Sequence, residues 1–186
     1  MTTAPTTTQL PTAGVYTIDP VHSTVGFVVR HLVAAKVRGQ FNEFAGTITV
    51  GETLEASTAE ATVQAASITT NNEMRDNHLK SGDFLEIETY PTLAFTSTGL
   101  TAKGGERFEL TGDLTIKGVT KSVTFDLEYL GSGTGMAPGS TVVGFEARTE
   151  IDRRDFGVNF EGALENGTIV VSNKVTIELA LEASKA

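Results

Sequence analysis

The side chains in this sequence that could carry out chemistry are three histidines and a few nearby polar residues. His22 lies close to Asp19 and Ser23, whereas His31 and His78 lie in two further segments. Histidines and carboxylates can bind a metal ion, and a serine, a histidine and an aspartate can form the catalytic triad of a hydrolase. Two kinds of site therefore come into question, a metal centre and a hydrolytic centre.

The spacing of these residues argues against both kinds of site. The sequence has no His-x-x-x-His pair, and His22 and His31 have opposite parity along one extended stretch. Adjacent residues of a strand point to opposite faces, so His22 and Ser23 could not share a proton. We therefore expect no catalytic residues, no metal ligands and no enzymatic activity. A metal-binding or metal-assisted hydrolytic protein that uses His31 and His78 is the alternative.

Composition narrows the function classes further. The chain has 186 residues, which suggests one domain, and its formal net charge is −9. This charge disfavours a nucleic-acid partner, because phosphate binding requires a basic surface. The sequence contains no cysteine, which excludes disulfides, a thiolate nucleophile and thiolate metal sites.

The beginning of the chain and its hydropathy predict where the protein is found. Residues 1–13 are mostly threonine, proline and alanine, and we expect them to form a disordered tail before a domain at 14–186. No stretch has the ~20 apolar residues that a membrane-spanning helix requires. The first residues also lack the basic stretch and apolar run of a secretory signal. We therefore expect a cytoplasmic protein without an integral membrane segment.

Apolar and polar residues alternate along most of the chain with the two-residue period of strands. In STVGFVVRH, every second residue from Val25 to His31 shares one face. About eight such stretches follow one another through short polar turns without intervening helices, which favours antiparallel connections. Phe41 and Phe44 differ in parity, which predicts a β-bulge near residues 42–43. Alternation alone does not distinguish a two-sheet sandwich from a closed barrel.

The residues on the inward faces favour the barrel. Small residues such as Gly46, Ala61 and Gly112 mix there with large phenylalanines. An antiparallel barrel of about eight strands is just wide enough to fill itself or to hold one small ligand. Small residues on an apolar wall would leave space for a ligand, or they would face bulky neighbours and help to fill the core. Both arrangements stay open at this point.

A charged segment at about residues 71–88 interrupts the strand pattern. Asn71 or Asn72 can cap the beginning of a helix, and Gly82 suits a left-handed end. The apolar residues between them must pack on another element. The segment therefore predicts one short helix that lies over an end or a flank of the strands.

Five segments together resemble the YceI family of lipocalin-like proteins that bind polyisoprenoids. They are YTIDPVHSTVGFVVRHL, VRGQFNEFAGTI, SITTNNEMRDNHLKSGDFLEIETYPTLAFTS, LTGDLTIKGVTKSVTF and RRDFGV, in the order of the family. The resemblance covers nearly everything from Val15 to Leu181. Tyr16 stands where the family often has tryptophan, and Leu85 follows Phe84 where a second aromatic residue is common.

The resemblance implies an all-β fold, an extended antiparallel lipocalin-like β-barrel of about eight strands with one short helical insertion. It implies a YceI-like lipid-binding domain at 14–186, a long apolar cavity and a homodimer. The function implied is non-enzymatic binding, transport or storage of an isoprenoid quinone, a prenyl-phosphate-like compound or another long-chain amphiphile, with no further cofactor. A dimeric interaction module with a packed core is the second alternative.

We expect the inward apolar residues of the barrel and two residues of the helical insertion to line the cavity. The candidates are Phe27, Val29, His31, Phe44, Ile48, Leu79, Phe84, Phe95, Leu114, Ile116, Phe125 and Phe145. Arg75, His78 and Arg154 are candidate head-group contacts. The alternative for Arg75 is an ion pair with Asp76 that fixes the helix, and the alternative for Arg154 is a role in a turn.

Overall fold

The computed structural model describes residues 10–32, 34–163, 165, 167 and 170–185. Within these residues the chain forms an 11-stranded sheet, one α-helix and two short 3-10 helices. The elements are β1 (Gly14–Ile18), β2 (Thr24–His31), β3 (Ala35–Phe41), β4 (Phe44–Val50), β5 (Thr58–Gln64), η1 (Ala65–Ser67), β6 (Ile68–Thr69), α1 (Glu73–Lys80), β7 (Thr92–Gly104), β8 (Arg107–Ile116), β9 (Val119–Thr134), β10 (Thr141–Asp152), η2 (Arg153–Phe156) and β11 (Val171–Lys185).

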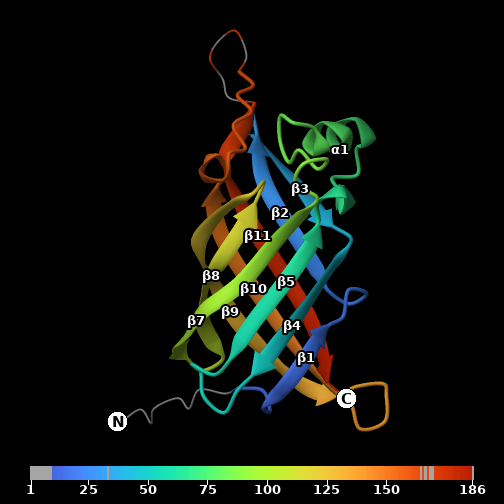
Figure 1. Ribbon diagram of the computed structural model, residues 1–186, viewed down its shortest axis with the longest axis vertical. Helices are drawn as coiled ribbons and strands as arrows, with labels where there is room; N and C mark the ends of the chain where they lie inside the picture. The colour runs from blue at the N-terminus through green and yellow to red at the C-terminus, as the bar shows by residue number, and fades with distance from the viewer. Residues whose placement is uncertain (1–9, 33, 164, 166, 168–169, 186) are drawn as a thin grey trace.

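Eight of these strands close into an antiparallel barrel (Figure 1). The strands follow the order β1-β4-β5-β7-β8-β9-β10-β11, and β11 pairs again with β1. The closure joins Thr17 to Ser184 and Ile18 to Ala183. The predicted lipocalin-like barrel is therefore confirmed, and the sandwich is excluded.

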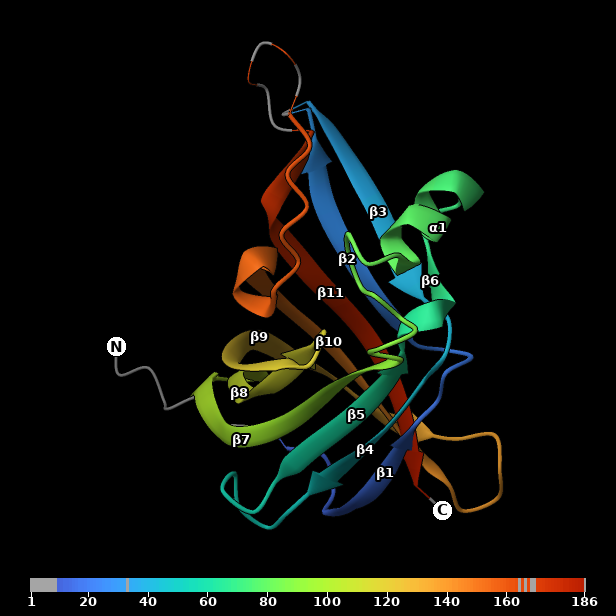
Figure 2. The ribbon, with the colours of Figure 1, turned by 45° about the horizontal axis from the view of Figure 1, so that its top comes forward.

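The remaining strands extend the wall on one side of the barrel. β2 pairs with β11, β3 pairs with β2, and β6 pairs with β3 at Gln40 and Phe41. In Figure 2 the β2–β3 hairpin rises above the closed part of the barrel, and β6 and α1 lie beside β3. The closed part of the barrel is therefore surrounded by strands, and the β2–β3 hairpin, β6 and α1 lie beyond it.

The chain changes neighbours between Phe41 and Phe44, through a break rather than the predicted β-bulge. The backbone N–H groups of Asn42 and Glu43 donate to the carbonyl and the hydroxyl of Ser67. The break resets the alternation of the strand. Phe41 and Phe44 consequently both face the interior, although they differ in parity.

The helical insertion is shorter than the predicted range of 71–88. The side chain of Asn72 accepts a hydrogen bond from the N–H of Arg75 and caps the beginning of α1. The helix ends at Lys80, and the next residue, Ser81, has an extended backbone. Gly82 is not in the left-handed region, so the predicted glycine stop is wrong. The N–H groups of Phe84 and Glu86 instead return to the carbonyl of Ser81, which folds the rest of the segment into turns. In the described part of the chain, no helix is long and apolar enough to cross a membrane.

The apolar core consists of two clusters at different levels of the barrel. One is built around Tyr16, Phe108, Tyr129, Phe145 and their neighbours, and the other around Phe84, Leu114, Ile116, Phe156 and Val158. Leu10 packs against the first cluster, and the Tyr16 hydroxyl donates to the carbonyl of Thr12 at 2.7 Å. The predicted tail at 1–13 falls largely outside the described residues, and its described end contacts the barrel.

Candidate functional site: an apolar cavity inside the barrel

A cavity of about 730 Å³ occupies the interior of the barrel. Its volume lies within the range of roughly 300–1,000 Å³ that is usual for small-molecule sites. Strands from around the barrel, α1 and the segment after η2 all contribute to its lining, and most of the lining side chains are apolar. The barrel is therefore not filled by its own side chains, which a packed-core interaction module would require.

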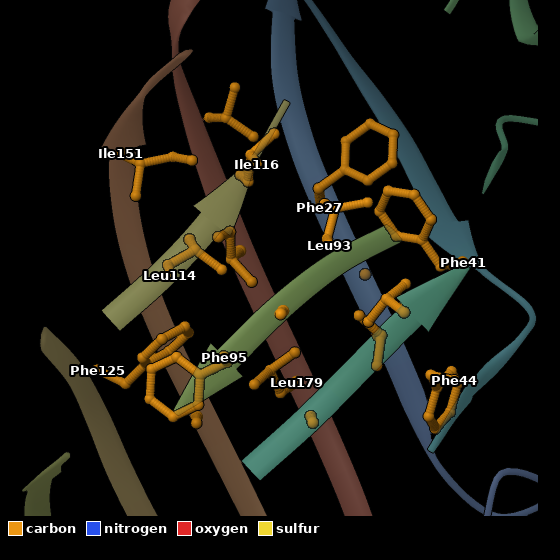
Figure 3. Close-up of a pocket in the computed structure, with 18 of the residues that line it drawn as sticks. Phe27, Phe41, Phe44, Leu93, Phe95, Leu114, Ile116, Phe125, Ile151 and Leu179 are labelled. Atoms are coloured by element: carbon orange, nitrogen blue, oxygen red, sulfur yellow. The ribbon is translucent and has the colours of Figure 1, made fainter. Parts of the chain in front are cut away.

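The predicted lining residues all border this cavity. These are Phe27, Val29, His31, Phe44, Ile48, Leu79, Phe84, Phe95, Leu114, Ile116, Phe125 and Phe145. In Figure 3 the rings of Phe27 and Phe41 lie together on one side of the view, and those of Phe95 and Phe125 lie together on the other. The ring centroids are 6.0 Å apart in the first pair and 5.5 Å apart in the second, which is T-shaped. The contact of these residues with a ligand stays a prediction.

Sequence reasoning missed several further lining residues, among them Leu93, Leu179, Phe156 and Phe160. Leu93 shares the parity of Phe95, and Leu179 continues the inward alternation of β11, so the strand period could have identified both. Phe156 and Phe160 lie in η2 and in the irregular segment that follows it. No period applies there, and the sequence carries no signal that places these rings at the cavity.

Three aromatic rings meet at the end of the cavity next to α1. The ring centroid of His78 lies 5.0 Å from that of Phe84 and 5.1 Å from that of Phe160, and both contacts are edge-to-face. The two phenylalanine centroids are 4.9 Å apart. His78 Nε2 lies 2.8 Å from a carboxylate oxygen of Asp83. This aromatic cluster joins the α1 segment to the segment after η2, and all three rings border the cavity.

The charged side chains of α1 hold the helix to the end of β6 through Thr70. Arg75 Nε donates to the Thr70 hydroxyl at 2.6 Å, and Arg75 Nη2 donates to the Thr70 carbonyl at 2.9 Å. Asp76 accepts hydrogen bonds from the backbone N–H and the hydroxyl of Thr70, and from the hydroxyl of Thr69. Burial raises the pKa of Asp76, but these hydrogen bonds outweigh burial and lower the pKa overall. The two charged residues thus fix the helix through a shared threonine, and not through the ion pair between them that was the alternative prediction.

The two arginines of the RRDFGV segment differ in burial and in their hydrogen-bond partners. The guanidinium of Arg153 is buried and donates to the carbonyls of Ser172, Val158 and Phe160 and to the side chain of Asn173. Arg154 is exposed and donates to both carboxylate oxygens of Asp152. Arg154 does not border the cavity, whereas Arg75 and His78 do. Of the three candidate head-group contacts, the structure therefore brings two to the cavity.

The polar residues near His22 lie outside the cavity. Asp19, His22 and Glu182 are the only group of three potential metal ligands among the described residues. His22 Nδ1 lies 2.7 Å from Asp19 and 3.8 Å from Glu182. The hydrogen bond to Asp19, with the charges of Asp19 and Glu182, raises the pKa of His22. The Ser23 hydroxyl instead bonds to the backbone of Glu182, so no triad forms.

His31 and His78 both border the cavity, but neither belongs to a group of three potential metal ligands in the described residues. His78 is instead bonded to Asp83 and packed between two phenylalanines. The arrangement offers an apolar enclosure with a few polar groups at the α1 end. Such an enclosure can remove an apolar molecule from water.

Comparisons with known proteins identify the relatives of this chain. A family model described as the YceI-like domain matches residues 16–183. A UPF0312 protein of Staphylococcus aureus strain N315 is 38% identical over 173 residues, covering 91% of this chain and 96% of that protein.

Two solved structures are similar to the whole barrel. BcnA of Burkholderia cenocepacia has a TM-score of 0.78 at 24% identity, covering 89% of this chain and 98% of that one. A domain from Saccharophagus degradans, described as a polyisoprenoid-binding domain implicated in plant cell wall breakdown, has a TM-score of 0.67 at 16% identity. That match covers 92% of this chain and 98% of the domain. At these identities, both structures show the fold.

Proposed function

This chain belongs to the YceI-like family, and we propose that it binds an isoprenoid or a similar long-chain amphiphile inside its barrel without changing it chemically. The observation that carries this proposal is the cavity of about 730 Å³ with its largely apolar lining. The polyisoprenoid-binding description of the Saccharophagus domain agrees with this ligand class.

The physics of burial fits such a ligand. A prenyl chain presents only hydrocarbon surface, and each buried CH₂ equivalent contributes about 0.8 kcal/mol of transfer free energy. The usable affinity is smaller, about 0.3 kcal/mol per heavy atom for ligands of this size. A chain of about 25 heavy atoms would then bind with about 7.5 kcal/mol, which corresponds to a low-micromolar dissociation constant. Ligand selectivity must come from the shape of the cavity and from the polar groups at its end.

The titratable residues that border the cavity support binding over catalysis. Arg153 uses its guanidinium on four protein acceptors, and His78 is bonded to Asp83. A hydrolytic site needs a nucleophile within hydrogen-bond reach of a base. Among the described residues, neither of these two groups contacts a serine or threonine hydroxyl. The Thr70 hydroxyl does contact charged groups, but it donates to Asp76 and accepts from Arg75, so it serves to hold α1.

The head group is proposed to lie at the α1 end of the cavity. Thr70, Asn72, Arg75 and His78 border the cavity there, and they are polar where most of the lining is apolar. An amphiphile bound tail-first would place its polar group beside these residues and its chain in the barrel. Arg154 has no part in this arrangement, because its guanidinium binds Asp152 away from the cavity.

Native mass spectrometry of the purified protein, before and after incubation with a long-chain polyprenol, tests the proposal. We expect one amphiphile per chain, and weaker uptake by Leu179→Gln, which places an amide in the lumen. Leu130→Gln is the matched control, because Leu130 is 57% exposed and does not border the cavity. Failure of the wild-type protein to retain any polyprenol, isoprenoid quinone or fatty alcohol would overturn the proposal.

A further inference from the structure

Two glycines on the inner wall lie against the rings of two cavity-lining phenylalanines. Gly39 of β3 is the direct antiparallel neighbour of Phe27 in β2. A Cβ atom at Gly39 would lie 2.3 Å from the Cζ atom of Phe27, and one at Gly112 of β8 would lie 2.4 Å from the Cζ atom of Phe95. Non-bonded carbon atoms prefer separations of about 3.5–4.0 Å. Each ring thus occupies the space that a side chain on the neighbouring strand would need.

Backbone conformation does not explain these two glycines. Neither Gly39 nor Gly112 has a positive φ, so other residues can adopt their backbone conformation. Gly99 of β7 also lacks a positive φ, but a Cβ atom there would meet nothing within 4 Å. The absence of a side chain therefore makes room for a neighbouring ring at Gly39 and Gly112, whereas a side chain at Gly99 would displace nothing.

The two rings lie on opposite sides of the same lumen. In Figure 3, Phe27 is on the side of β3 and Phe95 is on the opposite side, next to Phe125. Both rings border the cavity. If either ring turned away from its glycine, the space that it could enter is the space between the two walls.

We infer that Gly39 and Gly112 set the width of the lumen and so determine whether it admits a methyl-branched prenyl chain. This inference rests on the proposed function. At Gly39 the atoms that an added methyl group would meet are those of the Phe27 ring and the Thr70 methyl group. The ring would lie at 2.3 Å and the Thr70 methyl group at 2.9 Å, and Thr70 is held by Arg75 and Asp76, so the ring is the group that must move furthest. At Gly112 the backbone carbonyl of Thr96 would also be met at 2.6 Å, which makes Gly39 the cleaner position to change.

The test measures the affinity of a long-chain polyprenol for Gly39→Ala, with Gly99→Ala as the matched control. We expect Gly39→Ala to weaken binding at least about tenfold, because losing room for about two methylene groups is enough for such a change. Gly99→Ala should change the affinity by less than about twofold, because its methyl group meets no neighbour. In a Phe27→Ala background the ring is absent, and adding Gly39→Ala should then change the affinity by less than about twofold.

The outcomes separate this inference from the proposed function. If the wild-type protein binds polyprenol and Gly39→Ala binds it equally well, the inference is wrong while the proposed function stands. If the wild-type protein binds no amphiphile, the proposed function fails and the inference fails with it. If Gly39→Ala alone does not fold, the two variants in the Phe27→Ala background decide. If adding Gly39→Ala to Phe27→Ala weakens polyprenol binding tenfold, the Phe27 ring is not the cause of the weaker binding, and the inference is wrong.

Discussion

Asp76 of α1 binds Thr70 at two points, through the backbone N–H at 2.8 Å and through the hydroxyl. Thr70 follows the last residue of β6 and is buried. α1 itself has no buried residue. The contacts of His78 and Leu79 hold the later part of α1, and these polar contacts with one threonine hold its beginning.

Removing this carboxylate should loosen α1. We expect Asp76→Ala to lower the free energy of unfolding by about 2 kcal/mol, since hydrogen bonds to a charged group contribute roughly 1.5–3 kcal/mol. The amides of residues 73–80 should exchange hydrogen faster, because the helix loses its attachment to β6. Denaturant unfolding measures the first effect and hydrogen exchange read out by mass spectrometry measures the second, with Asp113→Ala on the exposed face of β8 as control. Unchanged exchange in 73–80 would contradict this role of Asp76.

Asp152 should titrate at unusually low pH. Hydrogen bonds from Arg154 lower the pKa of Asp152 to about 2 despite a partial opposing effect of burial. An unfolded aspartate has a pKa of about 3.9, so the stabilisation is present above pH ~4 and is lost as the pH falls from ~4 to ~2. Carboxyl carbon chemical shifts measure the midpoint directly. Arg154→Met should move it upward toward the ordinary value, and a wild-type midpoint near 4 would refute the pairing.

Much of the barrel could be predicted because alternation fixes which residues face inward. Phe95, Leu114 and Phe125 belong to three paired strands, and a period of two places each of them on the inward apolar face, which borders the cavity in the structure. Alternation also located the irregularity at Asn42 and Glu43, but it could not show that this is a break between two strands rather than a β-bulge. The break depends on hydrogen bonds to Ser67, which is distant in sequence.

Cavity-lining residues that lie outside strands could not be predicted from the sequence, because no regular period applies to them. Phe160 meets His78 and Phe84 from an irregular segment whose backbone accepts hydrogen bonds from Arg153. The sequence also could not show whether the small inward residues leave space for a ligand or face bulky neighbours, because the answer depends on the direction in which neighbouring rings point. At Gly112 the ring of Phe95 takes up the space, and a cavity still remains. The homodimer and the cytoplasmic location stay predictions.

Arg153 should be the more important of the two adjacent arginines for stability. Arg153 is 6% exposed, and its guanidinium donates to three backbone carbonyls and one side chain. We expect Arg153→Met to lower the free energy of unfolding by roughly 3 kcal/mol, because the buried acceptors lose their donor. Arg154→Met should have a much smaller effect, since its side chain is exposed. Denaturant unfolding of both variants makes the comparison, and equal losses would contradict it.

Phe160 should slow the release of a bound amphiphile. Its ring packs on His78 and on Phe84, and it joins the two segments that meet at the α1 end of the cavity. Each aromatic pair contributes about 0.5–1.5 kcal/mol, so losing two pairs in Phe160→Ala should accelerate dissociation roughly tenfold. Association should accelerate too, because the same contacts must open for entry, and the dissociation constant should therefore change less than the dissociation rate.

Transfer of a fluorescent polyene fatty acid from loaded protein to lipid vesicles measures the dissociation rate. Met136→Ala is the control, because Met136 is fully exposed and does not border the cavity. A Phe160→Ala protein that releases the probe at the wild-type rate would show that these rings do not close the cavity.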